Sequence, residues 1–237
     1  MSKPKTPIPF TVDGKKCQAS PGQTILQAAK DNGVYIPALC RWEGFKPAGA
    51  CRVCTVRVGG RYMAACTQPV IEGMAVENNV PDLQDMRKSL IEMLFVEGNH
   101  ICPTCEKSGN CELQALAYRF QMLVPRFPFQ FPTRKVEAAG KKILLEHNRC
   151  IKCLRCVRGV LTRDNKAVFG ALRRSRNKEI SVDQALASAL PEKQARQAMD
   201  RCPVGSILRK EVGFIVPIGK RKYDKAPIGN DVEKAKG

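Results

Sequence analysis

The sequence predicts an α+β fold divided into several small units rather than one large domain. The chain has 237 residues, which is enough for two or three small domains. Strand and helix patterns alternate along it, and its twelve cysteines form three separate groups with one left over. Aromatic residues make up only 6% of the chain, so the cores are expected to be small and built partly around bound groups.

The N-terminal unit is expected to contain two hairpins and a helix. Residues 8–19 contain an apolar stretch, an Asp-Gly turn and a second strand. Residues 24–32 predict a short helix that ends at Gly33. A loop rich in Gly and Pro follows, and residues 55–68 predict the second hairpin. This order of elements is typical of a β-grasp ferredoxin domain.

The first group of cysteines lies in that loop and in the second hairpin. Its spacing is C-x10-C-x2-C-x11-C, formed by Cys40, Cys51, Cys54 and Cys66. The spacing and the expected fold predict a [2Fe–2S] cluster under a surface loop, where the small residues 48–50 let backbone N–H groups reach the sulfurs. A zinc site is the alternative, but its ligands usually come as two C-x2-C pairs.

A helical segment is expected to follow. Residues 81–97 form an amphipathic pattern with Leu83, Met86, Leu90 and Leu94 at helical spacing. The second group of cysteines comes next, and a further helix begins just after its last member. The group has one histidine and three cysteines, which we expect to bind a [4Fe–4S] cluster: His100, Cys102, Cys105 and Cys111.

The third group has the clearest spacing. A C-x2-C-x2-C run with a remote Cys-Pro is the ligand pattern of one [4Fe–4S] cluster, with three thiolates on a tight turn and a fourth that closes the cage. Its members are Cys150, Cys153, Cys156 and Cys202. Val160 stands where a two-cluster ferredoxin would carry a further cysteine, so we expect a ferredoxin-like unit with a single cluster.

The remaining segments and residues are given simpler interpretations. Three phenylalanines could pin the extended linker 123–137 to a neighbouring surface. The charged insert 157–200 is interpreted as a solvated face. The polar tail 217–237 is expected to be mobile at its end or to dock on a partner. Cys17 is expected to be structural, and His147 to support the third site or to be unrelated to it. The chain is expected to divide into a β-grasp domain (1–79), a helical segment (80–122), an extended linker (123–139), a ferredoxin-like domain (140–216) and a C-terminal tail (217–237).

The net charge and the absence of targeting signals restrict the partners and the location expected for this protein. The formal charge is +18; three oxidised clusters would reduce it to roughly +13, which suits docking on acidic partner subunits. No apolar run is long enough to span a membrane, and the N-terminus carries no signal-peptide pattern, so a cytoplasmic protein with reduced cysteines is expected. A basic zinc protein that binds nucleic acid is the alternative, but aromatic residues for base stacking are few.

Taken together, the motifs resemble a known family. GVYIPALC, GACRVCTV, AACT, EGNHICPTCEKSGNCELQ, RCIKCLRC and CPVG resemble the iron–sulfur electron-transfer subunit of the diaphorase module in NAD-reducing [NiFe] hydrogenases. That subunit is similar to the N-terminal part of the large iron–sulfur subunit of complex I. The single residue between His100 and Cys102, and a chain that stops soon after the third group, favour the hydrogenase.

The resemblance implies a relay subunit with one [2Fe–2S] and two [4Fe–4S] clusters and no substrate site of its own. It would carry electrons between a flavin/NAD-binding diaphorase subunit and the small and large [NiFe] hydrogenase subunits in reversible H2:NAD+ oxidoreduction. No nucleic-acid partner is expected. The alternative keeps the same relay role in a NAD-dependent formate dehydrogenase or a complex I-like enzyme.

Overall fold

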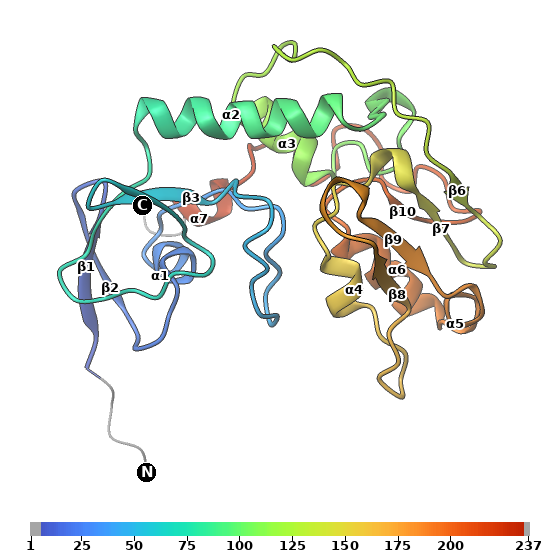
Figure 1. Cartoon of the computed structure of the whole chain (residues 1–237), viewed down its shortest axis with the longest axis horizontal. Helices are drawn as coiled ribbons and strands as arrows, with labels where there is room; N and C mark the ends of the chain where they lie inside the picture. The colour runs from blue at the N-terminus through green and yellow to red at the C-terminus, as the bar shows by residue number, and fades with distance from the viewer. Residues whose placement is uncertain (1–5, 235–237) are drawn as a thin grey trace.

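The computed structural model describes residues 6–234, and its N-terminal half is built on a five-stranded mixed sheet in the order β2-β1-β5-β3-β4. β1 runs antiparallel to β2 and parallel to β5, and β5 is antiparallel to β3. This is the arrangement expected of a β-grasp domain (Figure 1). Its elements are β1 (Ile8–Val12), β2 (Lys15–Ala19), α1 (Ile25–Asp31), β3 (Thr55–Val58), β4 (Arg61–Ala64) and β5 (Ala75–Glu77).

Local sequence signals explain the ends of these elements. Asp13 and Gly14 both have positive φ, which suits the tight turn between β1 and β2. Thr24 caps α1 in a reciprocal capping box with Gln27, and Gly33 has a φ of 72° just beyond the end of the helix. α1 packs its buried face, which includes Ile25, into the N-terminal core. Both predicted hairpins and the predicted helix are therefore confirmed.

A long helix joins the two halves of the molecule. α2 (Pro81–Val96) spans the distance between the N-terminal sheet and the C-terminal elements in Figure 1. The helix is present as predicted, but its buried face differs from the expected one. Leu90 and Leu94 are only partly buried, whereas Arg87 and Glu92 are fully buried. The apolar stripe is thus interrupted by two charged side chains with specific partners.

The C-terminal half combines two small sheets with short helices. One sheet has the order β10-β7-β6, and β8 pairs with β9 as a hairpin. The cysteine-rich middle segment shares a hydrophobic core with this half, since Ile91, Leu113 and Leu116 pack with Ile143 and Phe169. The elements are η1 (Cys102–Thr104), α3 (Glu112–Arg119), β6 (Val136–Glu137), β7 (Ile143–Glu146), η2 (His147–Arg149), α4 (Arg155–Gly159), β8 (Phe169–Leu172), η3 (Ser175–Asn177), β9 (Glu179–Val182), α5 (Gln184–Ala189), α6 (Glu192–Arg201) and β10 (Ile207–Arg209).

The insert 157–200 is more than a solvated face. It folds into the β8–β9 hairpin and two helices, and it contributes Phe169, Ile180 and Leu190 to the core. Its arginines at the hairpin tip, Arg173, Arg174 and Arg176, are exposed as expected. The charged residues at the hairpin tip therefore lie on one surface of a packed unit.

Polar contacts, among them those of Arg126, attach the linker 123–137 to the rest of the chain. Phe129 and Phe131 contact each other edge to face with ring centroids 4.9 Å apart, and Phe131 is exposed. Arg126 instead donates to Glu92 and Asp85 on α2, with both donor–acceptor distances at 2.8 Å. This bond explains why the acidic side chain of Glu92 is buried on the helix.

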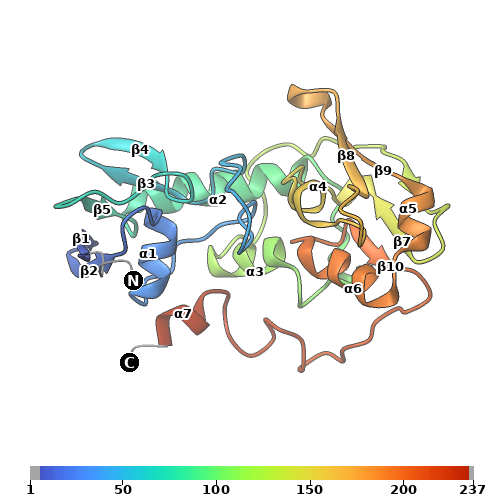
Figure 2. The ribbon, with the colours of Figure 1, turned by 90° about the horizontal axis from the view of Figure 1, so that it is seen from below.

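The C-terminal tail packs on this same chain. It runs from β10 along one side of the molecule to α7 (Asn230–Lys234), near α1 (Figure 2). The backbone N–H of Tyr223 donates to the Gly109 carbonyl, and Ile228 is buried. The very ends of the chain, including the residues on which the absence of a signal peptide was argued, lie outside the described residues. Among residues 6–234 no helix combines the length and the apolar character needed to cross a membrane.

Candidate functional site

The structure brings the four cysteines of the first group together beside the N-terminal sheet. Cys40, Cys54 and Cys66 are almost fully buried, and Cys51 is half-buried. Thiol hydrogen bonds join the Cys40 sulfur to Cys51 and Cys66, and the Cys54 sulfur to Cys66. The backbone N–H groups of Cys51 and Ala50 also donate to the Cys40 sulfur. The short residues before Cys51 thus allow the backbone approach that the sequence predicted.

The ionisation of these thiols is coupled. Hydrogen bonds from Cys51 and Cys66 lower the pKa of Cys40 to about 2, and the same bonds raise the pKa values of Cys51 and Cys66. A hydrogen bond from Cys66 also lowers the pKa of Cys54, to about 7, so the group by itself favours thiolates at some positions and neutral thiols at others. Bound metal ions with positive charge are what would allow four thiolates to coexist here.

The second group lies on the loop between α2 and α3. Cys111 caps α3, because its sulfur accepts a hydrogen bond from the backbone N–H of Gln114 at 3.4 Å. Burial raises the pKa values of Cys102, Cys105 and Cys111, the last to about 12. Gly205 leaves room for this group, since a Cβ there would lie 2.3 Å from the Cys105 sulfur.

His100 carries a buried nitrogen with no hydrogen-bond partner. Its Nε2 has none among the described residues, while the Leu94 carbonyl accepts a hydrogen bond from the ring. Burial lowers the pKa of His100 to about 4, so the imidazole is neutral at physiological pH. A neutral ring held by one nitrogen, with the other free, is the form in which histidine binds metal. This orphaned atom fits the predicted fourth ligand of the second group.

The third group encloses a small buried cavity. Its four cysteines line a space of about 20 Å³ together with apolar side chains such as Leu145 and Ile207. Lys152 and Leu154 adopt positive φ and tighten the loop, and the Lys152 N–H donates to the Cys150 sulfur at 3.4 Å. Burial raises the pKa of Cys153 to about 12. The lining and the N–H donor suit a buried metal–sulfur group rather than a reactive thiol.

A compact set of metal-ligating side chains lies outside the cysteine groups. Within residues 6–234, Glu137, His147 and Glu179 each place one ligand atom within 4.8 Å of the other two.

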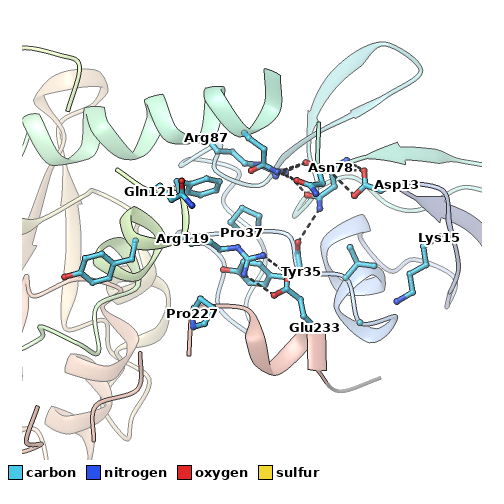
Figure 3. A pocket seen from close by; sticks show the side chains of 16 residues that line it. Asp13, Lys15, Tyr35, Pro37, Asn78, Arg87, Arg119, Gln121, Pro227 and Glu233 are labelled. Carbon is cyan, nitrogen blue, oxygen red and sulfur yellow. Dashed lines mark hydrogen bonds and ion pairs between the residues drawn. The ribbon is translucent and has the colours of Figure 1, made fainter. Parts of the chain in front are cut away.

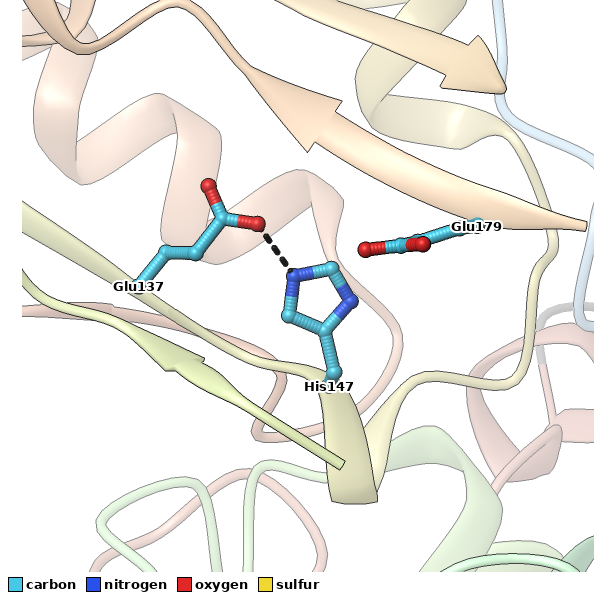
Figure 4. Close-up of side chains that lie close together, drawn as sticks. All are labelled: Glu137, His147 and Glu179. Carbon is cyan, nitrogen blue, oxygen red and sulfur yellow. Dashed lines mark hydrogen bonds and ion pairs between the residues drawn. The ribbon is translucent and has the colours of Figure 1, made fainter. Parts of the chain in front are cut away.

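This set already holds an internal cation. His147 Nε2 lies 2.7 Å from a Glu137 oxygen (Figure 4). The Lys135 ammonium lies 3.1 Å from the Glu137 carboxylate and 2.8 Å from that of Glu179. The His147 carbonyl also accepts a hydrogen bond from the backbone N–H of Cys150, which places this residue beside the third group. Cys17 lies apart, buried on β2 in the N-terminal core.

The third group lies next to both of the others. The Arg158 guanidinium donates to the carbonyl of Cys40 at 2.8 Å and to that of Cys153 at 3.3 Å. Toward the second group, the Glu112 N–H donates to the Pro203 carbonyl at 2.8 Å. The three groups therefore form one continuous constellation in which the third is central.

Sequence reasoning did not identify the arginines around these groups. Arg155 and Arg158 lie in and after the C-x2-C-x2-C run, and Arg87 lies four residues from both Leu83 and Ile91 on the buried face of α2. A basic residue inside a cysteine run and a cation within an apolar stripe were the signals available. No local pattern identifies the distant residues that these arginines contact.

Comparisons with known proteins find three iron–sulfur regions along the chain. A model described as "2Fe-2S iron-sulfur cluster binding domain" matches residues 5–81. "NADH-ubiquinone oxidoreductase-G iron-sulfur binding region" matches residues 87–126, and "NADH-quinone oxidoreductase subunit 3, ferredoxin-like domain" matches residues 140–208. The expected α+β fold, with an iron–sulfur binding region between two ferredoxin-type domains, is confirmed.

Individual relatives extend the match to nearly the whole chain. The chain is 48% identical to the gamma subunit of the NAD-reducing hydrogenase HoxS of Cupriavidus necator, over 92% of its own length and 93% of that protein. It is 32% identical to the mitochondrial "NADH-ubiquinone oxidoreductase 78 kDa subunit" of Candida albicans over 90% of its length, but it covers only 30% of that protein. A chain in a crystal structure of "NAD+-reducing [NiFe]-hydrogenase in the H2-reduced state" matches with a TM-score of 0.86 and 39% identity, over 93% of this chain and 94% of that one.

Proposed function

This chain belongs to the family of NAD-reducing hydrogenase gamma subunits, and from that membership we propose that it is the electron-relay subunit of such an enzyme. It would carry electrons between a [NiFe] hydrogenase module and a flavin- and NAD-binding diaphorase subunit. The observation that carries the proposal is the continuous constellation of three buried cysteine groups, with Arg158 bonded to carbonyls of two of them.

The ligand assignment is part of this proposal. Cys40, Cys51, Cys54 and Cys66 would hold one [2Fe–2S] cluster. Two [4Fe–4S] clusters would be held by the second and third groups, formed by His100, Cys102, Cys105 and Cys111 and by Cys150, Cys153, Cys156 and Cys202. When bound, such clusters take up and release single electrons without any change in protonation at a substrate.

The protein would supply three things to these centres. Buried apolar walls such as those around Cys153 exclude water, which sets the local dielectric. Backbone N–H groups at Gln114 and Lys152 donate to sulfur and would stabilise added negative charge. Arg158 ties the first and third loops together, so that the separation between their sites is fixed by a rigid contact.

We further propose that the chain itself has no substrate site. Its sequence contains no G-x-G-x-x-G after a strand and no Walker motif, so the hydride chemistry of NAD is assigned to the flavin subunit. The five-part division given above remains the proposed domain organisation. A cytoplasmic location, without a nucleic-acid partner, is proposed as well.

The partner surfaces are proposed from charge and exposed apolar side chains. The formal charge of +18 opposes self-association and favours acidic partners. The tail between β10 and α7 exposes Phe214, Ile215 and Ile218 with basic residues after them. Clustered exposed apolar side chains mark interaction sites, so we propose that a subunit of the hydrogenase complex covers this part of the tail.

A second candidate is the same relay role in a complex I-like enzyme or a NAD-dependent formate dehydrogenase. The 32% identity to the 78 kDa subunit of NADH-ubiquinone oxidoreductase favours this alternative. The near-complete mutual coverage with the hydrogenase gamma subunit supports the first candidate more strongly. The reaction of the purified complex distinguishes them: reduction of NAD+ by H2, reduction of NAD+ by formate, or reduction of a quinone by NADH.

Metal analysis tests the proposed cofactors. Iron, acid-labile sulfide and zinc are measured on the anaerobically purified chain, together with EPR spectra of the reduced form. We expect about ten irons per chain, from one [2Fe–2S] and two [4Fe–4S] clusters. Stoichiometric zinc without sulfide would overturn the relay function.

A further inference from the structure

Arg87 is a buried cation that contacts no carboxylate in the described part of the chain, residues 6–234. It lies on α2, its residue is 1% exposed, and three bonds hold its guanidinium. Nη1 donates to the Asn78 carbonyl at 2.9 Å, and Nη2 donates to the Asn78 side-chain oxygen at 2.8 Å and to the Thr55 carbonyl at 2.7 Å. Its Nε is buried without a partner among the described residues. Every atom that accepts a bond from Arg87 is therefore neutral.

The charged groups around Arg87 are occupied elsewhere. Asp13 accepts from the backbone N–H groups of Asn78 and Asn79, and Arg119 pairs with Glu233 on the tail (Figure 3). Burial lowers the pKa of Arg87 to about 10, which leaves it charged at neutral pH. An isolated charge inside a protein costs free energy unless an opposite charge compensates it. Arg155, the other buried arginine near the cysteines, has such a partner in Glu112.

The first cysteine group lies on the other side of Arg87. Thr55, whose carbonyl accepts from the guanidinium, is the residue directly after Cys54. Cys54 is also the strongest of the negative groups that favour the charged form of Arg87. A [2Fe–2S] cluster with four thiolates has a formal charge of about −2 when oxidised and about −3 when reduced. A cluster at this site would therefore supply the negative charge that is missing among the hydrogen-bond partners of Arg87.

We propose that Arg87 is the buried counter-charge of the first cysteine group and raises its affinity for an electron. This inference rests on the proposed [2Fe–2S] site. One electron from an external one-electron donor enters, no bond is broken, and no proton is taken up because Arg87 is already charged. Arg87 acts through the Thr55 carbonyl and the protein interior around it, so it is a positioning residue rather than a ligand. The low local dielectric makes its charge effective over this separation.

Two variants cancel the charge of Arg87 in different ways. In Arg87→Gln the cation is lost. In Asn78→Asp the cation stays, but a carboxylate of nearly the same shape replaces the amide oxygen that lies 2.8 Å from Nη2. We expect either variant to lower the equilibrium constant for reduction of the [2Fe–2S] centre at least tenfold, a fall of about 59 mV for one electron. The measurement is a redox titration of the purified complex, followed by the EPR signal of that centre.

Two further variants serve as controls. Arg87→Lys keeps the charge and should shift the equilibrium constant less than either charge-removing variant. Arg57→Gln removes an arginine three residues after Cys54 that is paired with Glu77 and Asp82, and it should leave the potential unchanged. A wild-type potential in both Arg87→Gln and Asn78→Asp would overturn the inference, as would equal shifts in Arg87→Lys and Arg87→Gln. Failure of the proposed function would look different, because the wild-type protein would then show no [2Fe–2S] signal.

Discussion

Arg155 and Glu112 form a bidentate ion pair, with donor–acceptor distances of 2.7 and 2.6 Å. Arg155 stands between Cys153 and Cys156, and Glu112 directly follows Cys111. The pair therefore connects the loops of the second and third cysteine groups. Arg155 is almost fully buried and also packs on the face of Trp42 at 5.2 Å. The arrangement of the second and third cysteine groups thus depends on a charge pair that is largely shielded from water.

Removing one partner of this pair should destabilise the protein strongly. In Glu112→Ala the Arg155 cation is left buried and unpaired, which costs about 3–5 kcal/mol. Differential scanning calorimetry of the loaded protein would measure the loss as a lower unfolding temperature. Glu43→Ala is the matched control, because its pair with Lys30 is solvent-exposed and worth about 0–1 kcal/mol. Equal stability of the two variants would contradict a structural role for Arg155 and Glu112.

The two histidines should behave differently when they are replaced. His100→Ala removes the proposed fourth ligand of the second group, so we expect loss of that cluster and about four of about ten irons. The [2Fe–2S] signal should be unchanged. His147→Ala is the control, since His147 binds Glu137 and should leave the iron content intact. Full iron content and an unaltered EPR spectrum in His100→Ala would remove His100 from the ligand set.

The exposed tail should be needed for assembly. Replacing Phe214 and Ile218 with serine removes apolar surface that is not part of the chain's own core, so folding and iron content should be unaffected. Binding to the partner subunits should weaken at least tenfold in a pull-down or by analytical ultracentrifugation. Ile71→Ser, which also removes an exposed apolar side chain, should assemble normally. Undiminished assembly of the double variant would place the interface elsewhere.

Local signals in the sequence predict most of the elements but not the contacts between them. The Asp13-Gly14 turn, the Thr24 cap and the helical spacing on α2 depend on neighbouring residues, and each appears in the structure. The bond from Arg158 to Cys40 joins residues 118 positions apart, and no periodic pattern encodes it. The cysteine spacings point to three groups, whereas their mutual arrangement arises from such long-range bonds.

The attachment of the linker and the position of the last helix both depend on residues far away in the sequence. The sequence suggests that phenylalanines could pin the linker, whereas Phe129 and Phe131 are exposed and polar contacts such as the ion pairs of Arg126 with α2 hold it. Glu92 on α2 is buried and needs a cation. The tail has no helical periodicity, and its last helix owes its position to tertiary contacts. Gly229 lies against the Tyr35 ring, and Glu233 pairs with Arg119. The sequence alone does not identify Tyr35 or Arg119 as the residues that the tail contacts.

Electron flow through the third group tests the relay most directly. In the complete complex we would measure H2-driven reduction of NAD+ and, separately, NADH oxidation with an artificial acceptor, for the wild type and for Cys153→Ala. Cys153 lines the buried cavity of the central group. We predict that Cys153→Ala abolishes the first activity and largely retains the second, because the flavin subunit reacts with NADH on its own. Unchanged H2-driven NAD+ reduction, in a variant shown to lack the third cluster, would contradict the relay.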